Sequence, residues 1–323
     1  MRSRFSVLVV TFLAAAAAGS GSAWAADVSM LNLLMPDAKF VTGVDVERTR
    51  NSPFGQYFLK QMAGQESGLS QFVEMTGVDP RRDVFELIVA SANSSAAGFS
   101  AGAGSVVIVR GSFDTSKLMQ LARAHGSAAT SYNGSQVVQT GKGKESAWAG
   151  FLGNLLVAGP ESGVKSAIDR YRASKKLDPM LMTRIQAASS RHDAWMLTTL
   201  SPAAFAGGVD NPNIKGAMAG DLMQGIENVT AGVKFGANVI VSGEAMTRSD
   251  KDASALVDVL RFFASMAQSN GAKSGPMGLL DAMQMSAEGR SVKFSLSTPE
   301  QEFEKLFAPG MSRVRSRTRA VLD

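Results

Sequence analysis

The sequence contains no cysteine, and it contains only two histidines among its 323 residues. Without cysteine there can be no disulfide framework and no lipid attached at a processed cysteine, so the stability of the chain must come from packing. A zinc site usually takes two or three histidines together with acids at helical spacing, and His125 and His192 offer no such pattern. Charged residues make up only 19% of the chain and glycines number 32, which indicates a surface rich in uncharged polar groups.

The chain also lacks a long apolar run. Its longest run, residues 5–18, spans about 14 residues, whereas a transmembrane helix needs about 20. This run follows Arg2 and Arg4 and is followed by small residues that end in Ala23-Trp24-Ala25. A basic start, a short apolar stretch and an Ala-x-Ala site are typical of a secretory signal peptide that is cleaved after Ala25.

The N-terminal pattern therefore predicts export to the periplasm or the extracellular space, as a soluble mature chain without a transmembrane anchor. Loss of Arg2 and Arg4 with residues 1–25 lowers the formal net charge from +5 to +3 over the remaining 298 residues. Basicity this weak does not indicate a nucleic-acid partner.

Strand-like and helix-like segments alternate along the rest of the chain, which is typical of an α+β or α/β protein. Residues 40–46 carry apolar side chains at every second position, and residues 84–90 and 105–111 are nearly continuous apolar runs, so all three predict strands. Asn133-Gly134 and Gly153-Asn154 predict tight turns between antiparallel strands, because these residue types tolerate positive φ. We expect an α+β fold of antiparallel sheets with helices on one face.

Helix starts are marked by residues that favour the N-cap position. Ser52-Pro53 and Asp114 each precede a predicted helix, and Asp250 begins a long helix with apolar residues spaced three to four apart. The segment Thr298-Pro299-Glu300-Gln301 matches a capping box, which predicts a further helix near the end of the chain.

The second half of the chain repeats the order of the first. Residues 107–111 (VIVRG) resemble residues 239–243 (VIVSG), and each half closes with a strand, a Pro-Glu pair and a helix. This order predicts an internal duplication over roughly residues 38–173 and 192–307. The predicted organisation is a signal peptide at residues 1–25, α+β halves at residues 26–175 and 176–308, and a basic tail at residues 309–323.

A set of structural motifs occupies most of residues 30–175. It comprises Met35-Pro36-Asp37-Ala38, the turn at residues 77–84, and the closing segments at residues 155–159 and 164–169. With these motifs the chain resembles uncharacterised bacterial exported proteins of domain-of-unknown-function type. The resemblance implies export and fold only, because that family has no established activity.

Catalytic motifs are few. Gly98-Phe99-Ser100-Ala101-Gly102 matches G-x-S-x-G, which exposes a nucleophilic serine when it forms a strand-to-helix elbow. Here the motif lies within a Ser-, Ala-, Gly- and Asn-rich stretch, residues 91–104, between two predicted strands, so a mobile loop is the favoured interpretation. His125 is expected at a helix C-terminus and His192 before a strand, both as surface or capping residues.

Two close acids, Asp79 and Asp83, could serve as the paired carboxylates of a glycoside hydrolase. Asp79-Pro80 is instead typical of a turn or helix start, and Asp83 can pair with Arg81 or Arg82. A structural role is therefore the favoured interpretation for both.

No cofactor and no metal are predicted. The close methionine pairs at residues 180–182 and 283–285 have no neighbouring histidine or cysteine, so core filling is favoured over copper binding. The basic turn Gly141-Lys142-Gly143-Lys144 lacks the spacing of a phosphate-binding loop.

The basic tail carries arginines at alternate positions, namely Arg313, Arg315, Arg317 and Arg319. In an extended conformation all four guanidinium groups would point the same way and could bind an anionic envelope component or an acidic protein. A solvated, disordered tail is the favoured interpretation.

Taken together, the sequence favours an exported, soluble, non-catalytic binding protein or a protein associated with the cell envelope. The alternative is a secreted or periplasmic hydrolase whose acids or serine converge only in the fold.

Overall fold

The computed structural model describes residues 25–63, 70, 73–74, 76–92, 104–140, 146–202, 204, 216, 220–269 and 283–305. Strands in this part of the chain form a single 12-stranded sheet, in which neighbouring strands are antiparallel. From one edge to the other they are β11 (Gln284–Glu288), β12 (Ser291–Pro299), β10 (Asn238–Thr247), β9 (Ile226–Lys234), β8 (Ala194–Thr198), β1 (Phe40–Asp45), β2 (Val84–Ser91), β3 (Ser105–Gly111), β7 (Leu155–Gly159), β6 (Ala147–Leu152), β5 (Ser135–Thr140) and β4 (Ala128–Tyr132).

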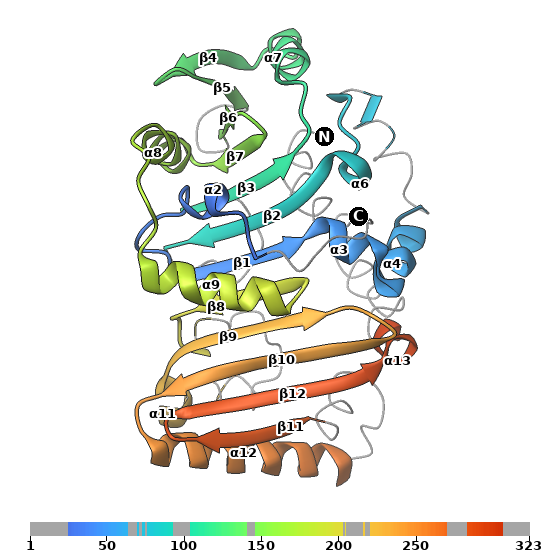
Figure 1. Cartoon of the computed structure of the whole chain (residues 1–323), viewed down its shortest axis with the longest axis vertical. Helices are drawn as coiled ribbons and strands as arrows, with labels where there is room; N and C mark the ends of the chain where they lie inside the picture. Colours follow the sequence, from blue (N-terminus) through green and yellow to red (C-terminus); the bar gives the residue numbers. More distant parts are fainter. Residues whose placement is uncertain are drawn as a thin grey trace, which may run out of the picture.

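Helices surround this sheet (Figure 1) and make the protein α+β, as the sequence predicts. They are α2 (Val28–Leu31), α3 (Val46–Asn51), α4 (Pro53–Ala63), α6 (Pro80–Asp83), α7 (Thr115–Ala124), α8 (Glu161–Arg172), α9 (Pro179–Arg191), α11 (Asp221–Gln224), α12 (Asp250–Ser269) and α13 (Glu300–Glu304). No helix in the described part of the chain is long and apolar enough to cross a membrane.

Helices cover both faces of the sheet, so the prediction that they lie on one face is wrong. Ile88 and Ile108 point to one face, where they share a core with α8 and α9. Leu87 and Val109 alternate with them and point to the opposite face, where they pack with Val46 at the start of α3. Hairpins that alternate with helices do not determine on which side each connection passes, and the sequence pattern carries no further signal.

The strand order is similar in the two directions from the neighbouring strands β1 and β8. On one side the order is β1-β2-β3-β7-β6-β5-β4, and on the other it is β8-β9-β10-β12-β11. In each direction three strands that follow one another along the chain lie side by side. The third then pairs with the last strand of a meander that follows a helix, which is β4 to β7 after α7 and β11 to β12 after α12.

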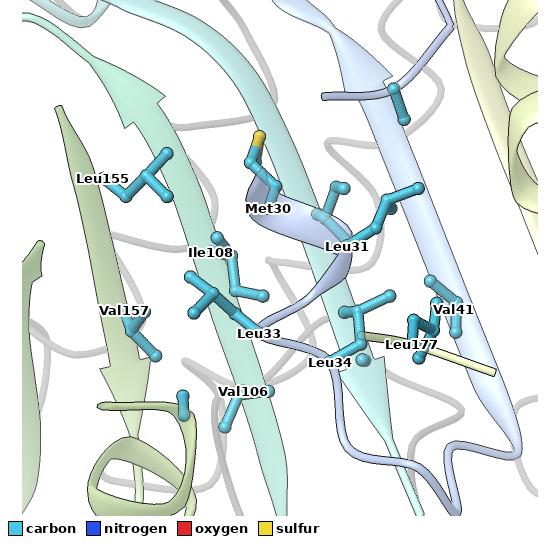
Figure 2. Packing of buried hydrophobic residues seen from close by; sticks show 14 of the residues in the cluster. Met30, Leu31, Leu33, Leu34, Val41, Val106, Ile108, Leu155, Val157 and Leu177 are labelled. Atoms are coloured by element: carbon cyan, nitrogen blue, oxygen red, sulfur yellow. The ribbon is translucent and has the colours of Figure 1, made fainter. Parts of the chain in front are cut away.

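The largest core lies between the sheet and α2, α8 and α9. Figure 2 shows Met30, Leu31, Leu33 and Leu34, from α2 and the turn after it, lying over strands β1, β2, β3 and β7. Each of these four side chains is at most 1% exposed. The first residues of the predicted mature chain are therefore part of the core.

Several predicted helix starts are confirmed. Ser52 Oγ accepts the Gly55 N–H, and an Asp114 carboxylate oxygen accepts the Lys117 N–H. The capping box at residues 298–301 is wrong, because α13 begins after Pro299 without a side-chain cap. Thr298 instead belongs to β12 and pairs with Val239, so sheet pairing outweighs the local capping pattern.

Candidate functional site

Several residues considered in the sequence lie outside the described part of the chain. They are the serine motif at residues 98–102, Lys142 and Lys144 of the basic turn, and Arg313, Arg315, Arg317 and Arg319 of the tail.

Asp79 and Asp83 have structural partners. Asp79 caps α6 and makes an ion pair with Arg81 at 2.9 Å, and the hydrogen bond from Arg81 lowers the pKa of Asp79. Asp83 is buried, accepts the Asp79 N–H at 2.8 Å and pairs with Arg82 at 2.7 Å. Both carboxylates are therefore engaged in holding the start of β2.

The two histidines differ in burial. His125 is exposed at the C-terminal cap of α7, as expected. His192 also occupies a helix C-cap, that of α9, as the capping alternative predicts, but it is buried and only 6% exposed. Its ring lies over Gly232 of β9, where a Cβ atom would come within 2.4 Å of the ring.

The hydrogen bonds of His192 determine its tautomer. Nδ1 lies 2.9 Å from the Ala188 carbonyl oxygen, which can only accept, so Nδ1 carries the proton. In the neutral ring Nε2 therefore accepts a hydrogen bond from the Ser242 hydroxyl at 2.8 Å. Burial lowers the pKa of His192 from its ordinary value of 6.5, which favours this neutral form at pH 7.

We expect ¹⁵N NMR of His192 to show the neutral Nδ1–H tautomer at pH 7. Because the folded-state pKa is lowered, the unfolded chain takes up the proton first, and the free energy of unfolding falls as pH drops below about 6.5. Ser242→Ala should cost about 1–2 kcal/mol, since Nε2 then loses its donor. A protonated ring at pH 7, or an Nε2–H tautomer, would contradict this assignment.

A row of charged side chains crosses the neighbouring strands β3, β2 and β1. Glu86 of β2 stands directly opposite Arg110 of β3 and Asp45 of β1. The row continues to Asp193, whose carbonyl accepts the Asp45 N–H at 2.7 Å. We call Arg110, Glu86, Asp45 and Asp193 the charged row. Asp45 and Glu86 are like charges in a directly opposed pair, an arrangement that needs compensation.

Two arginines bind the acids of the charged row. Arg110 lies 3.3 Å from Glu86 and 3.6 Å from Asp27, which caps α2. Arg48 of α3 lies 2.7 Å from Asp45 and 3.4 Å from Asp193. Its Nη2 also donates to the carbonyl oxygens of Ser189 and His192, which places a positive charge at the negative end of α9.

Burial perturbs the acids of the row. Glu86 is only 7% exposed, and its removal from water raises its pKa to about 7, although Arg110 opposes this shift. Burial also raises the pKa of Asp193, against the hydrogen bond from the Phe235 N–H and the charge of Arg48. Glu86 can therefore gain or lose a proton near neutral pH.

Because the pKa of Glu86 is raised, we expect the free energy of unfolding to fall between pH 5 and pH 8. The folded chain holds the Glu86 proton up to about pH 7 while the unfolded chain releases it near pH 4.3, so the free energy of unfolding decreases as pH rises through this window. The loss amounts to up to about 3 kcal/mol. Urea unfolding should show this decrease in a chain that keeps residues before Ala25, where the Ala26 nitrogen is a peptide amide.

The matched variant for this measurement is Glu86→Gln, which resembles the protonated carboxyl group in shape and charge. Between pH 5 and pH 8 the free energy of unfolding of this variant should fall less than that of the wild-type chain. The difference between the two decreases is the contribution of Glu86. Parallel pH profiles for the two chains would show that Glu86 is ionised throughout.

The start of the predicted mature chain lies beside the charged row. The Ala26 N–H donates to Ser189 Oγ at 2.8 Å, in the last turn of α9. The next amide, that of Asp27, points to a Glu86 carboxylate oxygen at 3.5 Å. Ala26 and Ser189 are both buried, whereas Ala25 is exposed.

A second feature is a polar surface on strands β9, β10, β12 and β11. Register places Thr230, Glu244, Lys293 and Ser286 in one line across these strands. We call its exposed members the polar face: Lys234, Ile240, Glu244, Gln284, Ser286, Glu288, Lys293 and Ser297. In Figure 1 no labelled helix crosses in front of β10 and β12. Two lysines and two glutamates balance its charge.

Among the described residues, no group of three or more His, Asp and Glu side chains is arranged to hold a metal ion. Sequence analysis missed the charged row, since its members lie up to 148 positions apart along the chain. A signal for the charged row was nevertheless present in the sequence. Glu86 and Arg110 are charged residues within otherwise apolar strands, at positions where the apolar pattern predicts core residues.

Comparison with protein-family models, curated proteins and solved structures found no match to this chain. The resemblance to uncharacterised exported proteins therefore stays a prediction.

Proposed function

We propose that this chain is an exported, non-catalytic binding protein of the cell envelope, processed after Ala25. The observation that carries the proposal is how the described candidate catalytic groups are used. Asp79 and Asp83 are paired with arginines, and His192 is buried between a carbonyl group and a serine. The polar face, in contrast, presents uncharged and charge-balanced groups to solvent, which suits a polar partner.

A photo-cross-linking experiment tests this function. A photoreactive amino acid replaces Ser297, which is exposed on the polar face, and in a second protein it replaces Lys251, which is exposed on α12. In cells that export the protein, irradiation should give a defined adduct from position 297 and none from position 251. Equal adducts from both positions, or none from position 297, would contradict binding through the polar face.

The arginines of the tail offer a second means of attachment in the same envelope. Arg313, Arg315, Arg317 and Arg319 would bind an anionic envelope component or an acidic protein through charge. Deletion of residues 309–323 should then abolish a salt-sensitive retention in the envelope fraction. Retention that survives the deletion would show that the tail is not the anchor.

The two halves of the chain derive, in this proposal, from an internal duplication. Support comes from the strand order, since β1-β2-β3-β7-β6 and β8-β9-β10-β12-β11 run outward in the same order, with β5 and β4 as an extension of the first half alone. In the first half, helices α8 and α9 bury the corresponding face of the sheet. The binding surface on the second half would then have arisen by divergence from such a copy.

The hydrolase alternative rests on one observation, the hydrogen bond between Ser242 and His192 Nε2. A serine beside a histidine is the minimal arrangement for an activated nucleophile. Here the orienting partner of the histidine is a carbonyl oxygen, and Ser242 lies within a strand that is paired on both sides, with Gly232 and Ser295, so its backbone is engaged in the sheet.

A fluorophosphonate probe distinguishes the two functions, because it reacts with activated serines. Under the binding proposal the purified protein remains unlabelled. Labelling that disappears in Ser242→Ala would establish the hydrolase instead.

A further inference from the structure

We propose that signal-peptide cleavage completes a binding site within the fold, in which the new α-ammonium group of Ala26 is held by Ser189 Oγ and faces Glu86 of the charged row. This inference rests on the proposed processing after Ala25. It assigns to Ser189 and Glu86 a role that depends on maturation of the chain.

The position of the Ala26 nitrogen is the first argument. This atom already donates to Ser189 Oγ at 2.8 Å, and Ala26 is only 5% exposed. The Asp27 nitrogen, three bonds further along the backbone, lies 3.5 Å from Glu86 Oε2. An ammonium at Ala26 therefore lies at most about 7 Å from the Glu86 carboxylate, within range of a strong interaction in a buried setting.

The exposure of the neighbouring residue is the second argument. Ala25 is exposed while Ala26 is buried, so the bond predicted to be cut lies at the boundary between surface and core. On hydrolysis the C–N bond breaks, the oxygen of water goes to Ala25, which leaves as a carboxylate, and both protons of water end on the Ala26 nitrogen. One amide donor thus becomes a cation with three donors.

Charge provides the third argument. The ion pairs around the row join four carboxylates, those of Asp27, Asp45, Glu86 and Asp193, to only two guanidinium groups, those of Arg48 and Arg110. One further cation improves this balance. Ser189 also lies in the last turn of α9, a helix of 13 residues, whose negative end favours a positive charge.

Each element around this site contributes charged or titratable groups. They are Asp27 at α2, Asp45 of β1, Arg48 of α3, Glu86 of β2, Arg110 of β3, Arg191 and His192 at the end of α9, Asp193 before β8, and Lys234 of β9. The arginines oppose an added cation and the acids favour it. We expect Glu86 to decide the sign of the effect, because it is a buried acid whose carboxylate lies 3.5 Å from the Asp27 amide nitrogen.

The test compares two purified chains. One begins at Ala26, released from a fusion by a protease that leaves no extra residue, and the other carries a Gly-Ser-Gly extension before Ala25. In the first chain, NMR of the Ala26 α-amino group should give a pKa of about 9 or higher, against an ordinary value of about 7.7–8.0. Its equilibrium constant for unfolding at pH 7 should be about tenfold smaller than that of the extended chain.

Two variants locate the effect. Glu86→Gln should return the α-amino pKa toward about 8 and reduce the difference between the two chains to less than twofold. Ser189→Ala should weaken the same difference without changing the charge of the row. An ordinary α-amino pKa together with equal unfolding constants, in chains that fold, would overturn the proposal.

Failure of export gives a different result. If the exported protein begins at another residue, the proposed processing is wrong, while the measurements on the chain that begins at Ala26 still report whether the site binds an ammonium group.

Discussion

Leu33→Ala should lower the free energy of unfolding by about 3 kcal/mol, within the 2–5 kcal/mol that large-to-small changes cost in a packed core. Leu33 is fully buried directly after α2, where it packs against the sheet together with Leu31 and Leu34 (Figure 2). The expected loss exceeds that of a surface change because truncation leaves a cavity among β3, β7 and the turn. Urea unfolding of the purified protein measures it.

Val28→Ala is the matched control, since Val28 belongs to the same short helix but is 45% exposed. It should change the free energy of unfolding by less than about 0.5 kcal/mol. Equal effects for the two variants would show that the segment after the predicted cleavage site does not dock in the core.

Gly43→Ala should have a comparable effect, a loss of about 3 kcal/mol, for the opposite reason. Gly43 lies in β1, opposite Trp195 of β8, and the indole ring lies across its Cα atom. A Cβ atom there would come within 2.4 Å of the ring. Trp195 is buried in the main core, so the ring cannot move aside without disturbing its neighbours.

A double-mutant cycle identifies the cause. In Trp195→Ala the ring is gone, so adding Gly43→Ala should cost less than about 1 kcal/mol, and the two changes should be strongly non-additive. Additive losses would show that the effect of Gly43→Ala does not come from the contact between β1 and β8.

Local signals in the sequence predicted most of the strands. The alternation of residues 40–46 and the apolar runs at residues 84–90 and 105–111 became β1, β2 and β3. The turns at Asn133-Gly134 and Gly153-Asn154 formed as expected, with positive φ at Asn133, Gly134 and Gly153. These signals work because they depend on residues close together along the chain.

Helix α9 was missed, although its pattern is present in the sequence. Asp178 accepts the N–H groups of Met180 and Leu181, and Pro179 occupies the first turn, which together form a standard helix start. Ile185 and Ala188 then provide the buried face. Core filling is the wrong interpretation for Met180, which is 74% exposed, whereas Met182 packs against the main core.

The charged row could not be predicted, because it depends on register between strands. Asp45, Glu86 and Arg110 come together only when β1, β2 and β3 pair at these positions. A shift by one residue would point Glu86 to the opposite face and leave Arg110 without this partner. Sequence alone specified the three strands but not the line of charge across them.

The proposed export and the observed fold meet at one residue. Ala26 is both the predicted first residue of the mature chain and a buried hydrogen-bond donor beside the charged row. Under the proposed processing, the mature chain would differ from its precursor by one positive charge at the Ala26 nitrogen.

The intact mass of the protein recovered from the periplasm or the culture medium tests the central claim most directly. We predict the mass of a chain that begins at Ala26, lower than that of the precursor by the mass of residues 1–25. A chain that retains residues 1–25 and stays in the cytoplasmic fraction would contradict the account.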